Sequence, residues 1–258
     1  MCLITAVLLQ ILSNLANDLG DHQHGTDNGA RVGPTRSVQS GAISPKAMRT
    51  AMVICAVLAF CSGLELITAS FQYTAQMWML LAIGLLAIAA AVKYTFGANP
   101  YGYSGFGDIS VFLFFGIVGV CGSYFLQSRG LETIVFLPAI AFGLLSTGVL
   151  NVNNMRDIHN DEASGKRTLV VRMGSSNAKV YHTALVAGGV VCLILFTMQS
   201  SMNWPRWLFL LVVPGFIVHL RRVWTAPEPR ALDPQLKVLA MGTFLTAVLF
   251  SLGLILAV

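Results

Sequence analysis

Charged residues are scarce in this chain. Asp, Glu, Lys and Arg together make up 10% of its 258 residues, whereas 55% are hydrophobic. Soluble domains carry about 25% charged residues. With a mean hydropathy of +0.72, the composition excludes an ordinary water-soluble domain. The apolar runs are long enough to cross a bilayer, which takes roughly 20 residues per helix.

Several other patterns are absent. The five cysteines form no Cys-x-x-Cys pair and all lie in apolar runs, so they indicate small buried side chains and no disulfide framework. The basic residues are dispersed over short loops without a recognition motif, which excludes nucleic acid as a partner. No basic residue precedes the first apolar run, so we expect no signal peptide.

The apolar runs predict α-helices and no barrel strands. Leu80–Val92 and Val111–Val120 do not alternate between apolar and polar residues, as barrel strands do. Since backbone groups in lipid must pair internally, an all-α, polytopic transmembrane helix bundle follows. We expect one intramembrane domain over 1–258. Its eight predicted spans are 1–16, 47–64, 77–93, 109–127, 132–150, 178–199, 206–221 and 238–258.

The basic residues give this topology a direction. With eight spans, 14 of the 16 Lys and Arg residues fall on one side of the membrane, and only Arg129 and Arg206 fall on the other. Basic loops remain in the cytoplasm. We therefore expect a multi-pass protein of the cytoplasmic membrane, with the basic side facing the cytoplasm.

Two acidic stripes lie at this same side, each at the end of an apolar span. Their helical spacing places the polar residues of each stripe on one helix face. Intramembrane carboxylates are costly and indicate function by default, although single interfacial Asp and Asn residues also cap helices. The first stripe is Gln10, Asn14, Asn17, Asp18 and Asp21, and the second is Thr147, Asn151, Asn154, Asp157 and Asp161.

Carboxylates on two facing helices would repel one another and protonate. A hard divalent cation removes this conflict, and Mg²⁺ binds through a few carboxylates together with substrate phosphates. Nearby basic residues supply the other half of a phosphate site. The pattern predicts a lipid diphosphate substrate bound through Mg²⁺. The predicted metal ligands are Asp18, Asp21, Asp157 and Asp161, and the phosphate-binding cations are Arg36, Lys166, Arg167 and Arg172.

Both acidic segments resemble the motifs of the UbiA-type intramembrane prenyltransferases. In that family Asn-Asp-x-x-Asp and Asp-x-x-x-Asp bind an isoprenyl diphosphate through Mg²⁺, as Asn17–Asp21 and Asp157–Asp161 would here. Three further segments, 33–41, 94–108 and 165–174, are similar to the branch that prenylates 1,4-dihydroxy-2-naphthoate in menaquinone biosynthesis. The family has nine spans, so the resemblance implies that this chain lacks the first helix.

This resemblance implies a multi-pass enzyme of the bacterial inner membrane. It would transfer a polyprenyl group from polyprenyl diphosphate to 1,4-dihydroxy-2-naphthoate with decarboxylation, which gives demethylmenaquinone. Lys93, Tyr94 and Asp108 would lie at the aromatic pocket. The catalytic residues implied are Asp18, Asp21, Asp157 and Asp161, and the substrate-binding residues are Asn14, Asn17, Arg36, Lys93, Tyr94, Asn154, Lys166, Arg167 and Arg172.

Three alternatives remain at this point. The acceptor could be 4-hydroxybenzoate or another aromatic compound. A secondary transporter also carries intramembrane carboxylates, although its site tends to lie near the midplane. A non-catalytic Mg²⁺-binding membrane protein is the third.

Overall fold

The computed structural model describes residues 1–28, 32–71, 74–199 and 203–257, and these residues form helices and no strand. The all-α prediction is confirmed. Within the described residues, eight helical segments are long and apolar enough to cross a membrane, as predicted. The end of the last predicted span, Val258, lies outside the described residues. The eight segments are Cys2–Gln23, Pro45–Ser70, Ala75–Lys93, Gly107–Ser128, Thr133–Arg156, Leu169–Gln199, Trp204–Thr225 and Pro229–Leu256.

Most of these helices extend beyond the predicted spans, and two of the extensions carry the acidic segments. Helix α1 (Cys2–Gln23) continues past residue 16, and α6 (Phe136–Arg156) continues past residue 150. Many large apolar side chains are exposed, among them Leu3 at 76% and Leu211 at 70%. Lipid can cover such side chains without penalty, so these exposures fit a protein immersed in a bilayer.

The described chain forms two compact units. The first comprises 1–107, 123–130 and 160–168, and the second comprises 108–122, 131–159 and 169–258. The shorter helical elements are η1 (Tyr101–Ser104), α4 (Gly107–Val111), η2 (Phe112–Cys121), α5 (Gly122–Ser128), η3 (Thr133–Val135), α7 (Ile158–Ala163) and η5 (Pro229–Leu232).

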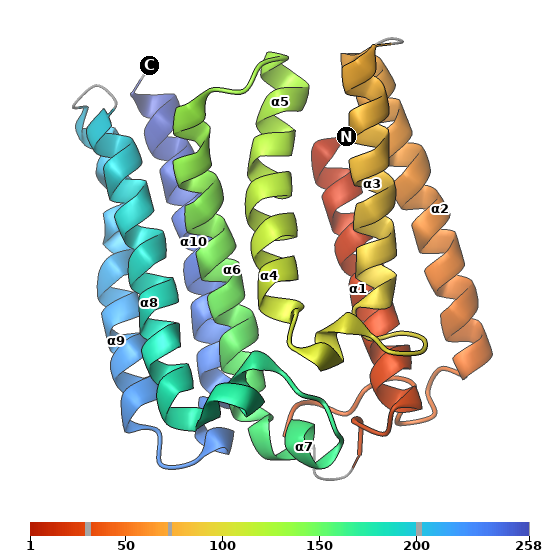
Figure 1. Ribbon diagram of the computed structural model, residues 1–258. Helices are drawn as coiled ribbons and strands as arrows, with labels where there is room; N and C mark the ends of the chain where they lie inside the picture. Colours follow the sequence, from red (N-terminus) through yellow and green to blue (C-terminus); the bar gives the residue numbers. More distant parts are fainter. Residues whose placement is uncertain (29–31, 72–73, 200–202, 258) are drawn as a thin grey trace. The chain divides into compact units, whose positions relative to one another are not determined.

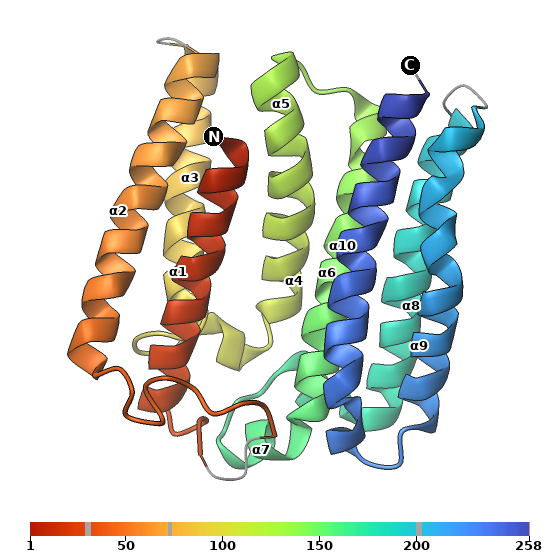
Figure 2. The same ribbon diagram turned by 180° about the vertical axis from the view of Figure 1, so that it is seen from behind.

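The first unit is built on α1, α2 (Pro45–Ser70) and α3 (Ala75–Lys93), which lie side by side in Figure 1 and Figure 2. Helix α2 begins where the Ser44 side chain accepts a hydrogen bond from the Ala47 N–H and proline follows, as expected for a helix N-terminus. Leu12, Ala16 and Leu19 of α1 are fully buried in its core. They recur at helical spacing, so they fix which face of α1 turns inward.

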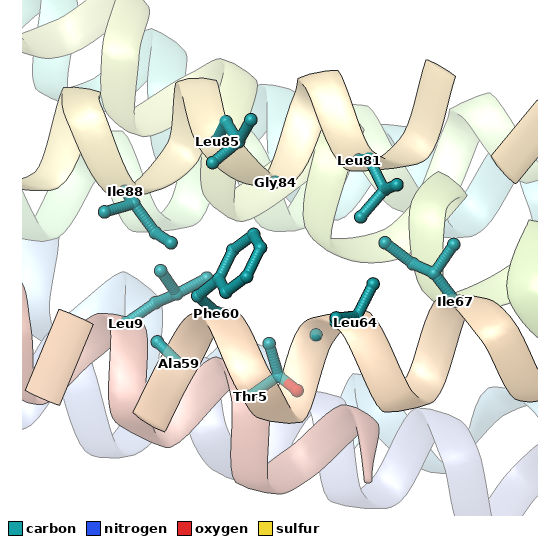
Figure 3. A pocket seen from close by; sticks show the side chains of 11 residues that line it. Thr5, Leu9, Ala59, Phe60, Leu64, Ile67, Leu81, Gly84, Leu85 and Ile88 are labelled. Carbon is teal, nitrogen blue, oxygen red and sulfur yellow. The ribbon is translucent and has the colours of Figure 1, made fainter. Parts of the chain in front are cut away.

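An apolar pocket lies between α1, α2 and α3 (Figure 3). Leu9, Phe60 and Leu85 are among its lining side chains. Of the lining side chains only Thr5 is polar, and its hydroxyl is hydrogen-bonded to Ser62 at 2.8 Å. The lining is therefore apolar, and it offers no charged group that would bind a diphosphate.

The second unit contains α6, α8 (Leu169–Gln199), η4 (Trp204–Val212), α9 (Val213–Thr225) and α10 (Asp233–Leu256). Leu145, Val152, Val186 and Leu239 are buried in its core. Helix α8 is kinked at Gly174, whose φ of 77° is a left-handed conformation that favours glycine.

Helix α6 also packs closely against η2 within this unit. A Cβ placed on Gly116 would lie 2.5 Å from the Ala139 carbonyl oxygen and 2.6 Å from the Gly143 Cα. Small residues allow such backbone contact between membrane helices, where packing drives association.

This contact predicts a difference between two glycines of the same span. Gly116→Ala should lower the free energy of unfolding by about 1–3 kcal/mol, because the added methyl overlaps the α6 backbone. Gly122→Ala should be neutral or slightly stabilising, since a Cβ there meets nothing within 4 Å. Thermal unfolding of both variants in detergent measures this. Equal melting temperatures would contradict the close packing.

Candidate functional site

The first acidic segment lies in the last turns of α1. Asp18 and Asp21 are 8% and 4% exposed. The Asp18 carboxylate accepts hydrogen bonds from the backbone N–H groups of Ser37 at 3.1 Å and Val38 at 3.2 Å. The loop that follows α1 therefore folds back onto its last turns, because that loop supplies donors for a buried charge.

Asp21 has three partners from distant parts of the chain. The Arg36 guanidinium donates to one of its oxygens at 3.2 Å, and the Tyr103 hydroxyl donates to the other at 2.8 Å. Lys166 Nζ lies 3.7 Å from that second oxygen. Burial, followed by the charge of Asp21, raises the pKa of Tyr103, so this hydroxyl stays protonated and remains a donor.

Lys166 connects the two acidic segments. Its ammonium lies 3.7 Å from Asp21 and 3.7 Å from Asp161, and 5.2 Å from the centre of the Tyr103 ring, a cation–π arrangement. Two hydrogen bonds hold this segment in place: the Asn160 side-chain amide donates to the Thr26 carbonyl oxygen at 2.9 Å, and the Arg167 backbone N–H donates to the Tyr103 carbonyl oxygen at 2.9 Å. Carboxylates 140 positions apart thus share one cation.

The cluster combines four carboxylates with two cations. The side chain of Asp27 is fully buried and belongs to the same cluster, because its Oδ2 lies 3.4 Å from the Arg36 Nε. Within the described residues, no three acidic, His or Cys side chains converge as a ready metal cage. The donors are carboxylate and hydroxyl oxygens, the ligand type that hard divalent cations prefer. The carboxylates of the cluster are Asp18, Asp21, Asp27 and Asp161.

Asp157 lies in the second unit and has different partners. Helix α6 ends at Arg156, and α7 begins at Ile158. The prediction of one continuous helical stripe through Asp157 and Asp161 is therefore wrong, because Asp157 itself has the non-helical conformation that separates the two helices. Arg156 holds the Asp157 carboxylate with two hydrogen bonds, at 3.0 and 2.6 Å.

Arg156 is buried in this unit and donates hydrogen bonds to three side chains. Besides Asp157, it donates to the Asp233 carboxylate at 2.8 Å and to the Asn153 side chain at 3.0 Å. Its side chain is 3% exposed. A planar guanidinium suits several oxygen partners at once, so Arg156 fixes Asp157 against the start of α10.

The predicted asparagines differ in environment. Asn154 is 3% exposed. Asn17 accepts a hydrogen bond from the Thr95 hydroxyl at 2.8 Å, and Asn14 is exposed and accepts one from Gln10 at 3.3 Å. The structure does not assign a substrate contact to any of the three, and their roles stay predictions.

The remaining predicted residues lie nearer the surface. Lys93 is exposed and contacts the Ala98 carbonyl at 3.5 Å. Tyr94 is half-buried and packs edge-on against Tyr101, with ring centres 5.4 Å apart. Arg167 and Arg172 have exposed side chains. Their roles toward a substrate likewise stay predictions.

Sequence reasoning missed two residues of these clusters. Tyr103 lies in a glycine-rich segment, and its contacts with Asp21 and Lys166 arise from residues far away in the sequence. Arg156 stands beside Asp157 in the sequence, and a basic residue next to an acidic motif was the available signal.

The fold is that of a polytopic helical membrane protein. Its buried carboxylates pair with cations near the ends of helices, as Asp21 does with Lys166 and Asp157 does with Arg156. The model of the UbiA prenyltransferase family matches residues 1–245. The chain belongs to this family, and the predicted membership is confirmed.

Two bacterial relatives align with nearly the whole chain, and a third aligns with most of it. The 1,4-dihydroxy-2-naphthoate octaprenyltransferase of Escherichia coli is 47% identical over 257 residues, which is 100% of this chain and 83% of that protein. The protein of the same name from Haemophilus influenzae is 43% identical over 255 residues, 99% of this chain and 83% of that protein. The 2-carboxy-1,4-naphthoquinone phytyltransferase of Synechocystis is 23% identical over 223 residues, 86% of this chain and 69% of that protein.

The ion pairs of Arg156 lead to a prediction of stability. Arg156→Met should lower the free energy of unfolding by about 3 kcal/mol, because Asp157 is left as an unpaired buried charge. Adding Asp157→Asn should recover part of this loss. Arg230→Met, at an exposed position, serves as the control and should have little effect. Thermal unfolding in detergent compares the variants, and an Arg156→Met protein as stable as the control would refute the pairing.

Proposed function

We propose that this protein transfers a polyprenyl group from polyprenyl diphosphate to 1,4-dihydroxy-2-naphthoate, with loss of the carboxylate, in menaquinone biosynthesis. The observation that carries this proposal is the cluster in which Asp21 and Asp161 share Lys166. Family membership and the names of the relatives support it. The chain would form a single domain that spans the bacterial inner membrane, with its site facing the cytoplasm.

The residues fit Mg²⁺ as the cofactor. The donors are carboxylate and hydroxyl oxygens, which hard divalent cations prefer, and two of the carboxylates, Asp21 and Asp161, each lie 3.7 Å from Lys166. When bound, Mg²⁺ neutralises charge on the diphosphate. The proposed ligands are Asp18, Asp21, Asp157 and Asp161.

Arg36 and Lys166 bind the diphosphate in this proposal. Both are paired with carboxylates of the cluster, with side chains 24% and 11% exposed. Phosphate oxygens can replace those carboxylates as partners without moving the cations far. Cations already in position stabilise the negative charge that develops on the leaving diphosphate as the C–O bond breaks. The Tyr103 hydroxyl, which remains a donor, orients Asp21.

Further polar side chains complete the proposed substrate site. Asn14, Asn17 and Asn154 orient ligands and bound water. The exposed cations contact phosphate or the acceptor carboxylate, and Lys93 and Tyr94 contribute to the aromatic pocket. The exposed cations are Arg167 and Arg172.

An assay on membranes containing the full chain tests the function. Labelled polyprenyl diphosphate is supplied with 1,4-dihydroxy-2-naphthoate or 4-hydroxybenzoate, with Mg²⁺ or with a chelator. We expect a prenylated, decarboxylated naphthoquinol by mass only with the naphthoate and Mg²⁺, together with released diphosphate. Product with 4-hydroxybenzoate alone would reassign the acceptor, and absence of diphosphate release would favour a transporter.

The metal ligands predict a matched pair of variants. Asp161→Asn should reduce Mg²⁺-dependent transfer at least about 100-fold. The substitution removes the negative charge of a proposed ligand of the cation, and this cation stabilises the diphosphate. Glu162→Gln changes the exposed neighbour in the same way and should leave transfer unchanged. Initial rates at saturating substrates, corrected for the amount of inserted protein, measure both. Full activity of Asp161→Asn would exclude its role as a ligand.

A further inference from the structure

Both oxygens of the Asp157 carboxylate are engaged by one cation of the protein itself. Arg156 donates from Nε to Oδ1 at 3.0 Å and from Nη2 to Oδ2 at 2.6 Å. The two side chains are buried, at 3% and 8% exposed. A guanidinium that holds both oxygens of a carboxylate combines charge with matched geometry. A metal ion at Asp157 would lie beside this guanidinium on the same two oxygens, so the two cations compete for them.

Arg156 also contacts a second carboxylate. Its Nη1 donates to Asp233 Oδ1 at 2.8 Å, and its Nη2 donates to the Asn153 side-chain oxygen at 3.0 Å. Asp233 begins α10, which lies beside α6 in Figure 1 and Figure 2. The Asp233 side chain is 47% exposed, so water solvates part of its charge. The guanidinium therefore keeps a negative partner if it leaves Asp157, and its charge is not left unpaired in the protein.

The backbone of the second acidic motif makes the Arg156–Asp157 pair possible. Adjacent side chains of a continuous helix project about 100° apart and do not face each other. Here α6 ends at Arg156 and α7 begins at Ile158, while Asp157 has a φ of −97° and a ψ of 8°. A contact between α6 and α10 alone requires only Arg156 and Asp233. The break at Asp157 adds the motif carboxylate to this contact, which points to a role for Arg156 at the motif itself.

We propose that Arg156 is the resting partner of Asp157, and that its guanidinium shifts to Asp233 alone when Asp157 takes up its metal ion. The inference rests on one part of the proposed function, the role of Asp157 as a metal ligand. Arg156 and Asp233 are positioning residues, because they act on the site through Asp157. The exchange replaces one ionic partner by another and breaks no covalent bond. Its consequence is that Arg156 lowers the affinity of Asp157 for the metal ion.

Other roles of Arg156 predict different behaviour. If Arg156 only joins α6 to α10, weakening its contacts lowers stability and leaves the affinity for the metal ion unchanged. If its charge acts only over distance, lysine at this position has the same effect as arginine. Arg156→Lys keeps the charge, but a single ammonium lacks the planar fork that holds both oxygens of Asp157. Competition therefore predicts that Arg156→Lys binds metal ions more tightly than wild type.

The test measures binding of Mn²⁺ alone to the full chain in detergent, by electron paramagnetic resonance. Mn²⁺ shares the preference of Mg²⁺ for carboxylate oxygens. Arg156→Lys should lower the Mn²⁺ dissociation constant at least about five-fold, because the paired hydrogen bonds to Asp157 are lost. Arg222→Lys, at an exposed position, is the matched control and should bind Mn²⁺ as wild type does. In transfer assays, Arg156→Lys should reach its half-maximal rate at a lower Mg²⁺ concentration than wild type.

A double-mutant cycle assigns the effect to Asp157. Asp157→Asn removes the carboxylate for which the cations compete, so in this background Arg156→Lys should change the Mn²⁺ affinity by less than about two-fold. Asp233→Asn should weaken Mn²⁺ binding when Asp157 is present, because Arg156 loses its second carboxylate. It should have little effect in the Asp157→Asn background, whereas a charge effect over distance persists there. Glu228→Gln, at an exposed position, is the control for the lost carboxylate.

The outcomes separate this inference from the function on which it rests. If wild type transfers the prenyl group and Arg156→Lys has wild-type Mn²⁺ affinity, the inference is wrong and the function stands. If the variants change Mn²⁺ binding as expected and wild type gives no product, the function is wrong and the exchange stands. Equal Mn²⁺ affinity of wild type and Asp157→Asn overturns the inference. Should Arg156→Lys fail to insert, Asp233→Asn decides: unchanged Mn²⁺ affinity overturns the proposal, and a loss that requires Asp157 supports it.

Discussion

Carboxylates buried in a membrane protein must be given partners, and much of the described structure beyond the helices follows from this constraint. Transfer of an unpaired charge into a low-dielectric environment is expensive. The loop after α1 therefore turns back so that its N–H groups reach Asp18. The segment 160–168 is held by hydrogen bonds to the carbonyl oxygens of Thr26 and Tyr103, which place Lys166 beside Asp21 and Asp161.

The same pairing prepares the cluster for an anionic substrate. Arg36 and Lys166 are held by carboxylates and need no rearrangement of the backbone to meet phosphate oxygens. Such preorganisation is the main source of electrostatic stabilisation in enzymes, because the cations are not reoriented when charge develops. The carboxylate oxygens of the cluster suit a divalent cation, which would hold the diphosphate beside Arg36 and Lys166.

Much of the fold could be predicted from the sequence because its signals are local. Long apolar runs require helices in lipid, so eight spans were predicted, and the described residues contain eight helical segments that could cross a membrane. Helical spacing also placed Asp18 and Asp21 on one face of α1. The second segment was less predictable. Asp157 interrupts the helix while Arg156 binds its side chain, and a periodic pattern cannot reveal a break that depends on such a contact. Tyr103 was missed for the same reason, since its partners lie far away in the sequence.

The sequence by itself determined that this is a helical membrane protein with two acidic motifs, because apolar length and motif spacing are properties of neighbouring residues. It also identified the family, which the comparison with known proteins confirmed. Only the tertiary structure decided that Lys166 lies beside both Asp21 and Asp161, and that Arg156 holds Asp157. The physical reason is that the partner of a buried charge depends on which distant segments pack beside it.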